Sequence, residues 1–273
     1  MSYRYTPYLL PFLLAFGLVG FVLLRAWRFR KTPMGRAFLW MLIALQVWTF
    51  GFILEIAAVE LAGKLFWANI QFLGILPLPL FWFEISLLFT GHTKNIRKYL
   101  FLASLPVILV LLSIWTNDYH HLFRGQPYLD CTSAPFCILV NDYGVAFYVD
   151  AVFSYLLFLF SLALMGSSLV MTKPLYRQQI SLMLISLAVP LTTDLLYVMG
   201  ISPIPHFNFT TVTFSIGSVF MSIALFRFRL FSIRPMAYDL IVENMNDGIV
   251  IVLPQRKMEF WQPCYSSQQE PKP

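Results

Sequence analysis

Seven long apolar stretches, separated by short polar segments, dominate the first 226 residues of the chain. Each is long enough to cross a hydrocarbon core of about 30 Å as a helix that rises about 1.5 Å per residue. The pattern therefore predicts an all-α membrane protein built as a seven-transmembrane helix bundle. The predicted spans are Tyr8–Leu24, Ala37–Val59, Leu65–Thr90, Tyr99–Trp115, Ala146–Met171, Ile180–Met199 and Asn208–Phe226.

Prolines within two of these spans predict departures from a straight helix. Pro77 and Pro79 lie in the middle of the long third span, and Pro190 lies in the sixth. Proline lacks the backbone N–H that a helix needs and its ring clashes with the preceding turn. We therefore expect a bent third helix and a bend in the sixth.

The composition agrees with a lipid environment. The chain is 59% hydrophobic and only 12% charged, whereas soluble domains usually carry about 25% charged residues. Its basic residues lie in short runs beside the apolar spans, where membrane topology explains them better than a nucleic-acid surface does. We predict the lipid bilayer as a partner, the cell (plasma) membrane as a multi-pass location, and no nucleic acid.

Lysine and arginine predict the orientation of the chain. Thirteen of them follow the odd-numbered spans, whereas three, Arg4, Lys64 and Arg124, lie on the other side. By the positive-inside rule the N-terminus is outside and the C-terminus is cytoplasmic, which an odd number of spans satisfies. Three arginines after the last span are predicted to anchor it at the anionic inner surface, although they also serve simply as topology markers. They are Arg227, Arg229 and Arg234.

Polar residues inside the spans are the candidate functional groups, because a charge at the bilayer centre costs a few kcal/mol. The predicted topology places such residues from the second, third, fifth and sixth spans at a similar depth in the outer half. Converging faces would form an outward-opening ligand pocket; alternatively, the outermost carboxylates simply reach interfacial water. The predicted ligand-binding residues are Glu55, Asn69, Gln71, Asp150, Asp194, Tyr197 and Asn208, with His206 near the mouth.

Three further observations concern chemistry outside that predicted pocket. Glu84 lies in the inner half of the third span and is either a relay for a proton or conformational change or a protonated carboxyl bonded to a neighbouring helix. Cys131 and Cys137 lie in the outer loop Thr116–Val145, where they form either a short disulfide or two free thiols. The histidines lie in loops or at span ends, so the sequence predicts no metal and no cofactor.

Several motifs in order resemble the N-terminal seven-helix sensor region of bacterial and archaeal histidine kinases, a region that also precedes diguanylate cyclases. They include LPLPLFWFEISLLFTG (Leu76–Gly91), TNDYHHLF (Thr116–Phe123) and YRQQISLMLISLAVPLTTDLLYVMG (Tyr176–Gly200). The family often carries an acidic residue before a Thr-Pro pair at the start of span seven. Here HFNFTTVTF (His206–Phe214) has Asn208 near that acidic position and no proline.

The C-terminal segment resembles the opening of a PAS domain. ENMNDGIVIVLPQRKMEFWQPCYS (Glu243–Ser266) reads as a short helix and two strands. The resemblance implies a seven-helix sensor domain over residues 1–234, then a connecting helix and a truncated, incomplete α/β PAS start over residues 235–273. No phosphoacceptor-histidine segment, ATP-binding lid or cyclase signature is present, so we expect no enzyme activity from this chain.

These observations favour a membrane signal-sensing input module of a histidine kinase-type signal transduction protein. It would detect an unknown small molecule or membrane signal and pass a conformational change to a cytoplasmic output. Expected partners are a second copy of the chain in a homodimer and a separate kinase output protein. A small-solute transporter or channel is the alternative, although the chain has no detectable inverted repeat. A further alternative is a non-functional remnant of a truncated sensor gene.

Overall fold

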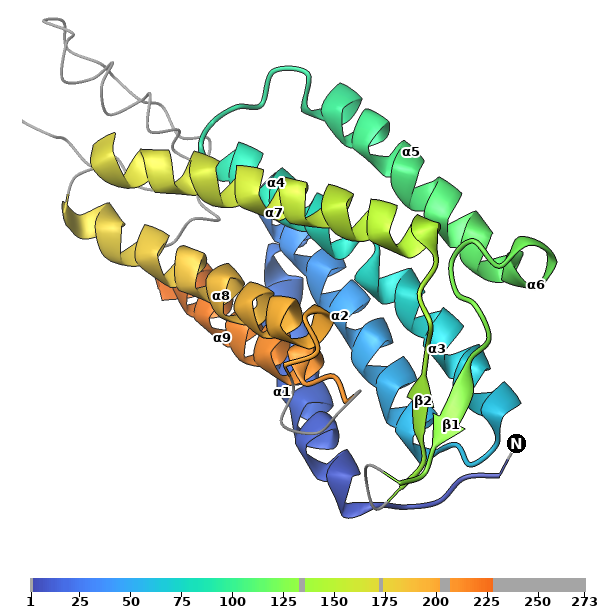
Figure 1. Ribbon diagram of the computed structural model, residues 1–273. Coiled ribbons are helices and arrows are strands. Elements are labelled where there is room, and N and C mark those ends of the chain that lie inside the picture. Colours follow the sequence, from blue (N-terminus) through green and yellow to red (C-terminus); the bar gives the residue numbers. More distant parts are fainter. Residues whose placement is uncertain (1, 133–135, 172–173, 202–206, 228–273) are drawn as a thin grey trace, which may run out of the picture. The chain divides into compact units, whose positions relative to one another are not determined.

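The computed structural model describes residues 2–132, 136–171, 174–201 and 207–227, which belong to one compact unit (Figure 1). The unit is mostly helical because nearly every apolar stretch of the sequence continues for several helical turns. Its long helices are α1 (Leu10–Ala26), α2 (Pro33–Ala57), α3 (Leu61–Ile75), α4 (Leu78–Phe89), α5 (Ile96–Trp115), α7 (Val145–Met171), α8 (Pro174–Val198) and α9 (Thr210–Arg227). Two 3₁₀ turns, η1 (Pro7–Leu9) and η2 (Trp27–Phe29), flank α1.

Among the described residues, six helices are long and apolar enough to cross a membrane, and Thr210–Phe226 is a shorter apolar helix. The third of the six comprises α3 and α4 together, which the chain breaks at Leu76 and Pro77. The predicted bend of the third span is therefore confirmed. α8 continues through Pro190 as one helix, and the bend expected there stays a prediction. The predicted membrane-spanning bundle is confirmed, with boundaries that differ by a few residues from those expected.

α2 lies at the centre of the bundle, where it packs against α1, α3, α4 and α9 (Figure 1). α4 also packs against α7, α7 packs against α8, and α8 packs against α9. These helices therefore surround a shared interior. Buried apolar side chains fill the inner half of that interior, including Phe38, Leu42, Ile85, Met183 and Leu225. Because lipid is as apolar as these side chains, close packing rather than escape from water stabilises the helix contacts.

The outward faces of several helices carry large apolar side chains that no other part of the described chain covers. Leu14 and Leu24 on α1 and Phe101 and Leu109 on α5 are each at least 66% exposed. A soluble protein rarely exposes such a continuous apolar surface. These faces are the lipid contacts of a multi-pass membrane protein.

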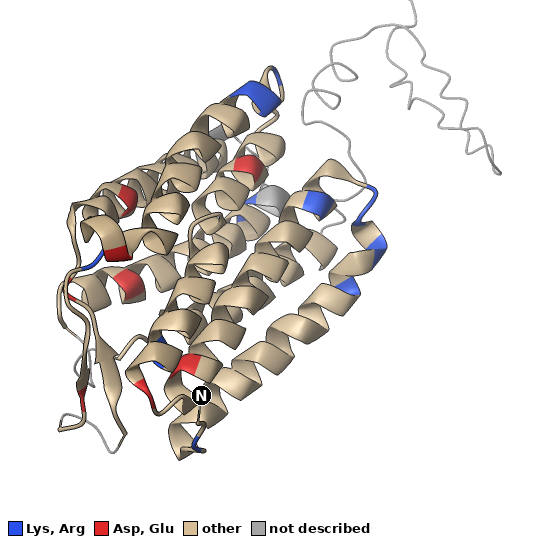
Figure 2. Cartoon of the chain, turned by 90° about the vertical axis from the view of Figure 1, so that its right-hand side faces the viewer, with Lys and Arg blue, Asp and Glu red and all other residues tan. Residues whose placement is uncertain are grey.

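Lysine and arginine gather mostly at the end of the bundle away from the N-terminus (Figure 2). The positive-inside rule assigns that end to the cytoplasm. We call it the inner end, and we call the end that holds the N-terminus the outer end.

The outer loop between α5 and α7 is folded rather than extended. It contains the short helix α6 (Asn117–His120) and an antiparallel hairpin of β1 (Tyr128–Asp130) and β2 (Ile138–Val140). A disulfide joins Cys131, which directly follows β1, to Cys137, which directly precedes β2. β2 is buried along its whole length, so the hairpin covers part of the outer end.

Candidate ligand-binding cavity in the outer half of the bundle

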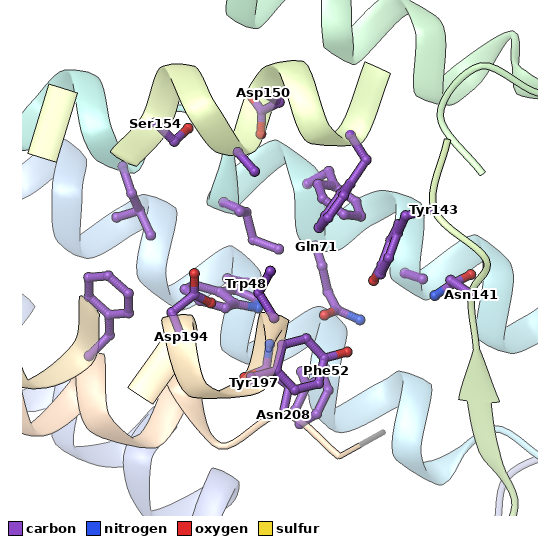
Figure 3. A pocket seen from close by; sticks show the side chains of 18 of the residues that line it. Trp48, Phe52, Gln71, Asn141, Tyr143, Asp150, Ser154, Asp194, Tyr197 and Asn208 are labelled. Carbon is purple, nitrogen blue, oxygen red and sulfur yellow. The ribbon is translucent and has the colours of Figure 1, made fainter. Parts of the chain in front are cut away.

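A cavity of about 150 Å³ lies in the outer half of the bundle. Its walls are formed by α2, α3, α4, α7, α8, α9, β2, and the segments that follow β2 and precede α9. Figure 3 shows polar side chains from several of these elements around the same space. The polar residues that line it are Glu55, Gln71, Asn141, Tyr143, Asp150, Ser154, Tyr155, Asp194, Tyr197 and Asn208. Six of the seven residues predicted to bind ligand are therefore brought to one cavity.

Helical periodicity explains which residues of α3 reach the cavity and why Asn69 does not. Ala68, Gln71, Phe72 and Ile75 line it at spacings of three and four residues, which place side chains on one helical face. Asn69 is two residues from Gln71, or about 200° around the helix. The expectation that both side chains face one pocket is therefore corrected: Asn69 lies outside the lining.

Glu55 belongs to a polar cluster at the outer end of α2. The side-chain amide of Gln71 donates a hydrogen bond to the Glu55 carboxylate. Lys64 is buried, and its Nζ donates to the backbone carbonyl of Glu55 at 2.7 Å and to that of Ile56 at 3.4 Å. A cation at a helix C-terminus satisfies its last carbonyls and complements the negative end of the helix dipole. Lys64 therefore caps α2 and also interacts electrostatically with the Glu55 side chain.

Asp194 connects two helices across the cavity. The hydroxyl of Tyr155 on α7 donates a hydrogen bond of 2.7 Å to Oδ2 of Asp194 on α8. Both side chains line the cavity, and Tyr197 lies one turn further along α8. Hydrogen bonds between membrane helices are typically worth about 0.6 to 2 kcal/mol. This bond therefore stabilises the contact between α7 and α8 only modestly.

Asp150 on α7 differs from the other two carboxylates in its surroundings. The residue is only 7% exposed, and its Oδ1 has no hydrogen-bond partner among the described residues. The side chain points from α7 toward the cavity (Figure 3). A buried carboxylate without a partner is costly, so this group is available for an interaction that a bound molecule supplies.

The folded outer loop places Arg124 and Tyr143 at the outer end of the bundle, near the cavity. The guanidinium of the buried Arg124 lies 5.9 Å from the ring centre of Phe72 and 5.5 Å from that of Phe123, within cation–π range. Tyr143 lines the cavity and stacks on Phe147 with ring centres 3.7 Å apart. Burial raises the pKa of the Tyr143 hydroxyl, so this group stays protonated and can donate a hydrogen bond.

Several predicted residues lie away from the cavity or outside the described chain. Glu84 on α4 interacts electrostatically with Arg36, near the start of α2 at the inner end, and does not line the cavity. Arg227 is the last residue of α9. The remaining predictions fall on residues that the structure does not describe, namely His206, Arg229, Arg234, and the connecting helix and PAS start at 235–273.

Sequence reasoning missed Trp48, Asn141, Tyr143, Ser154 and Tyr155, which all line the cavity. Ser154 could have been found, because it lies one helical turn from Asp150 and so shares its face. Tyr143 and Asn141 could not have been found, because the fold of the outer loop decides whether their side chains reach the cavity. Among the described residues, no group of three or more His, Cys, Asp or Glu side chains could hold a metal ion.

Comparison with known families gives one match. A family model described as the N-terminal 7TM region of histidine kinase matches residues 10–235, which include all of the long helices α1 to α9. No curated protein matches the chain.

Proposed function

Since this chain belongs to the family of N-terminal seven-transmembrane regions of histidine kinases, we propose that its outer cavity binds a small signal molecule and that binding changes the state of a cytoplasmic kinase. The observation that carries the proposal is the cavity itself. Polar side chains from four helices and two connecting segments converge on one cavity, whereas apolar side chains form the core cluster at the inner half of the bundle. Polar groups at membrane depth are costly and typically mark function.

The arrangement of α8 and α9 supports a route from the cavity to the inner end. α8 carries Asp194 near its outer end and packs along the length of α9. Gly217 on α9 fits closely against the backbone carbonyl of Ser186 on α8, and at the inner end the Gln179 side chain donates to the carbonyl of Ala224 at 3.3 Å. A displacement of α8 at the cavity would therefore move α9, which leads into the cytoplasmic segment.

The proposal assigns binding and signal transfer, but no catalysis, to this chain. Phosphotransfer would be carried out by a histidine-kinase output unit, either joined to this region or on a separate protein. Because such output units act as dimers in kinase relatives, we expect the module to work as a homodimer in the plasma membrane. A transporter is less well supported, because Glu84, the carboxylate deeper in the bundle, does not line the cavity.

Filling the cavity tests the proposal without knowledge of the ligand. With a reporter kinase domain fused after Asp247, Ser154→Phe places a ring in the cavity, because Ser154 is part of its lining. We expect basal autophosphorylation of the reporter to change by about fivefold or more, the range of ordinary coupling between sites. The matched control is Ser167→Phe on the same helix, where the side chain is exposed. Wild-type autophosphorylation from a membrane-inserted Ser154→Phe protein would contradict the proposal.

A further inference from the structure

The cavity lining contains acidic side chains but no basic ones. Glu55, Asp150 and Asp194 contribute carboxylates, and none of the described lining residues is a lysine, arginine or histidine. Lys64 is directed to the carbonyls at the end of α2, and Arg124 lies against Phe72 and Phe123. An anionic ligand would therefore meet no cationic side chain on the cavity wall.

Among the three lining carboxylates, Asp150 is the one with a buried oxygen that has no hydrogen-bond partner among the described residues. Glu55 accepts from Gln71, and Asp194 accepts from Tyr155. Asp150 is more than nine-tenths buried and lines the same cavity, and its Oδ1 has no hydrogen-bond partner among the described residues. A buried carboxylate is stabilised when an opposite charge lies beside it, and the cavity has room for a molecule that supplies one.

Aromatic rings form much of the remaining wall. Trp48 and Phe214 have ring centres 5.6 Å apart, and Phe158 lies 6.3 Å from Phe214. Tyr143 and Phe147 line the cavity near its outer end. The negative face of an aromatic ring attracts ammonium groups, and tryptophan does so best. Carboxylates combined with aromatic faces in a water-poor site suit an organic cation better than a hydrated metal ion.

We propose that the cavity binds a small organic cation with an ammonium group, which pairs with the Asp150 carboxylate and lies against the ring of Trp48. The inference rests on the proposed function, since it names the ligand class of the same cavity. A cavity of about 150 Å³ suits a compact head group rather than a long chain. Primary and quaternary ammonium groups share the chemistry that this wall recognises.

The test measures binding to the full chain in lipid nanodiscs by titration calorimetry. The cationic probes are choline and ethylammonium; the controls are 3,3-dimethylbutan-1-ol, a neutral isostere of choline, and acetate. We expect choline or ethylammonium to bind at least about tenfold more tightly than the neutral isostere, a difference typical of a buried charge pair. Asp150→Asn should weaken binding of that cation by about tenfold or more. The matched variant Asp118→Asn, an exposed carboxylate of the outer loop, should bind it as the wild type does.

Folding of each variant is checked by its thermal unfolding midpoint, and Ser154→Phe gives a second, steric block of the same cavity. The inference is overturned if neither cation binds at about 10 mM, or if Asp118→Asn weakens binding as much as Asp150→Asn does. If the neutral isostere or acetate binds as tightly as the cations and Ser154→Phe abolishes that binding, the cation assignment fails while the proposed function stands. If Asp150→Asn does not fold, loss of cation binding in a folded Ser154→Phe protein supports the site, and retained binding overturns it.

Discussion

Replacing Gly74 by alanine is expected to lower the free energy of unfolding by about 3 kcal/mol or more. Gly74 on α3 packs directly against the backbone of α2. An added Cβ would overlap the backbone carbonyl oxygen of Ala44 and lie 2.7 Å from the amide nitrogen of Trp48. Neither atom can move without a shift of α2 against α3. Since Trp48 lines the cavity, the substitution should disturb the site as well as stability.

Gly17→Ala is the matched control for this prediction. Gly17 lies within α1, and an added Cβ there meets no atom within 4 Å. Alanine is a better helix former than glycine by up to about 1 kcal/mol, so the control should be neutral or slightly stabilised. Unfolding of both variants in mixed micelles by titration with sodium dodecyl sulfate gives the comparison. Equal midpoints for the two variants would show that the α2–α3 contact is not as tight as described.

Asn117→Ala should cost about 3 kcal/mol and loosen the outer loop. Asn117 is buried, and its side-chain oxygen accepts hydrogen bonds from the backbone amides of Phe123 at 3.0 Å and Arg124 at 3.1 Å. Its amide group donates to the carbonyl of Arg124 at 2.9 Å. Alanine leaves these three buried backbone groups without partners, which is more costly than the loss of the bonds alone.

Hydrogen exchange at the amides of Phe123 and Arg124, together with the unfolding midpoint, measures this effect. Asn117→Asp keeps an oxygen that can accept both amide hydrogen bonds, so the amides of Phe123 and Arg124 should be better protected than in Asn117→Ala. Asp118→Ala, the next residue and an exposed one, should change stability by less than about 0.5 kcal/mol. Unchanged amide protection in Asn117→Ala would remove the role given to this side chain.

Features encoded in local sequence could be predicted. Long apolar stretches identified the spans, because a backbone in lipid must satisfy its own hydrogen bonds and does so as a helix. Pro77 located the break between α3 and α4, since proline cannot continue the hydrogen-bond ladder. Depth estimated from the rise per residue was sufficient to group Glu55, Asp150 and Asp194, although these residues are far apart along the chain.

Features that depend on contacts between distant segments could not be predicted. Depth alone does not distinguish Asn69 from Gln71, because rotation about the helix axis decides which side chain faces the cavity. Lys64 and Arg124 were counted only as charges on the outer side, yet both are buried. Their positions depend on the end of α2 and on the rings of Phe72 and Phe123, which only the folded chain brings near them.

The central claim, that occupancy of the outer cavity changes the inner end, is tested most directly by a distance measurement across the membrane. Spin labels are attached at Lys94→Cys and Gln178→Cys, which are both exposed at the inner end. The distance between them reports the position of α8. Cys264 is replaced by serine in all samples so that it is not labelled. We predict that a saturating organic cation shifts the distance distribution from pulsed electron resonance, and that Asp150→Asn removes the shift. An unchanged distribution in a protein shown by calorimetry to have bound the cation would contradict the account.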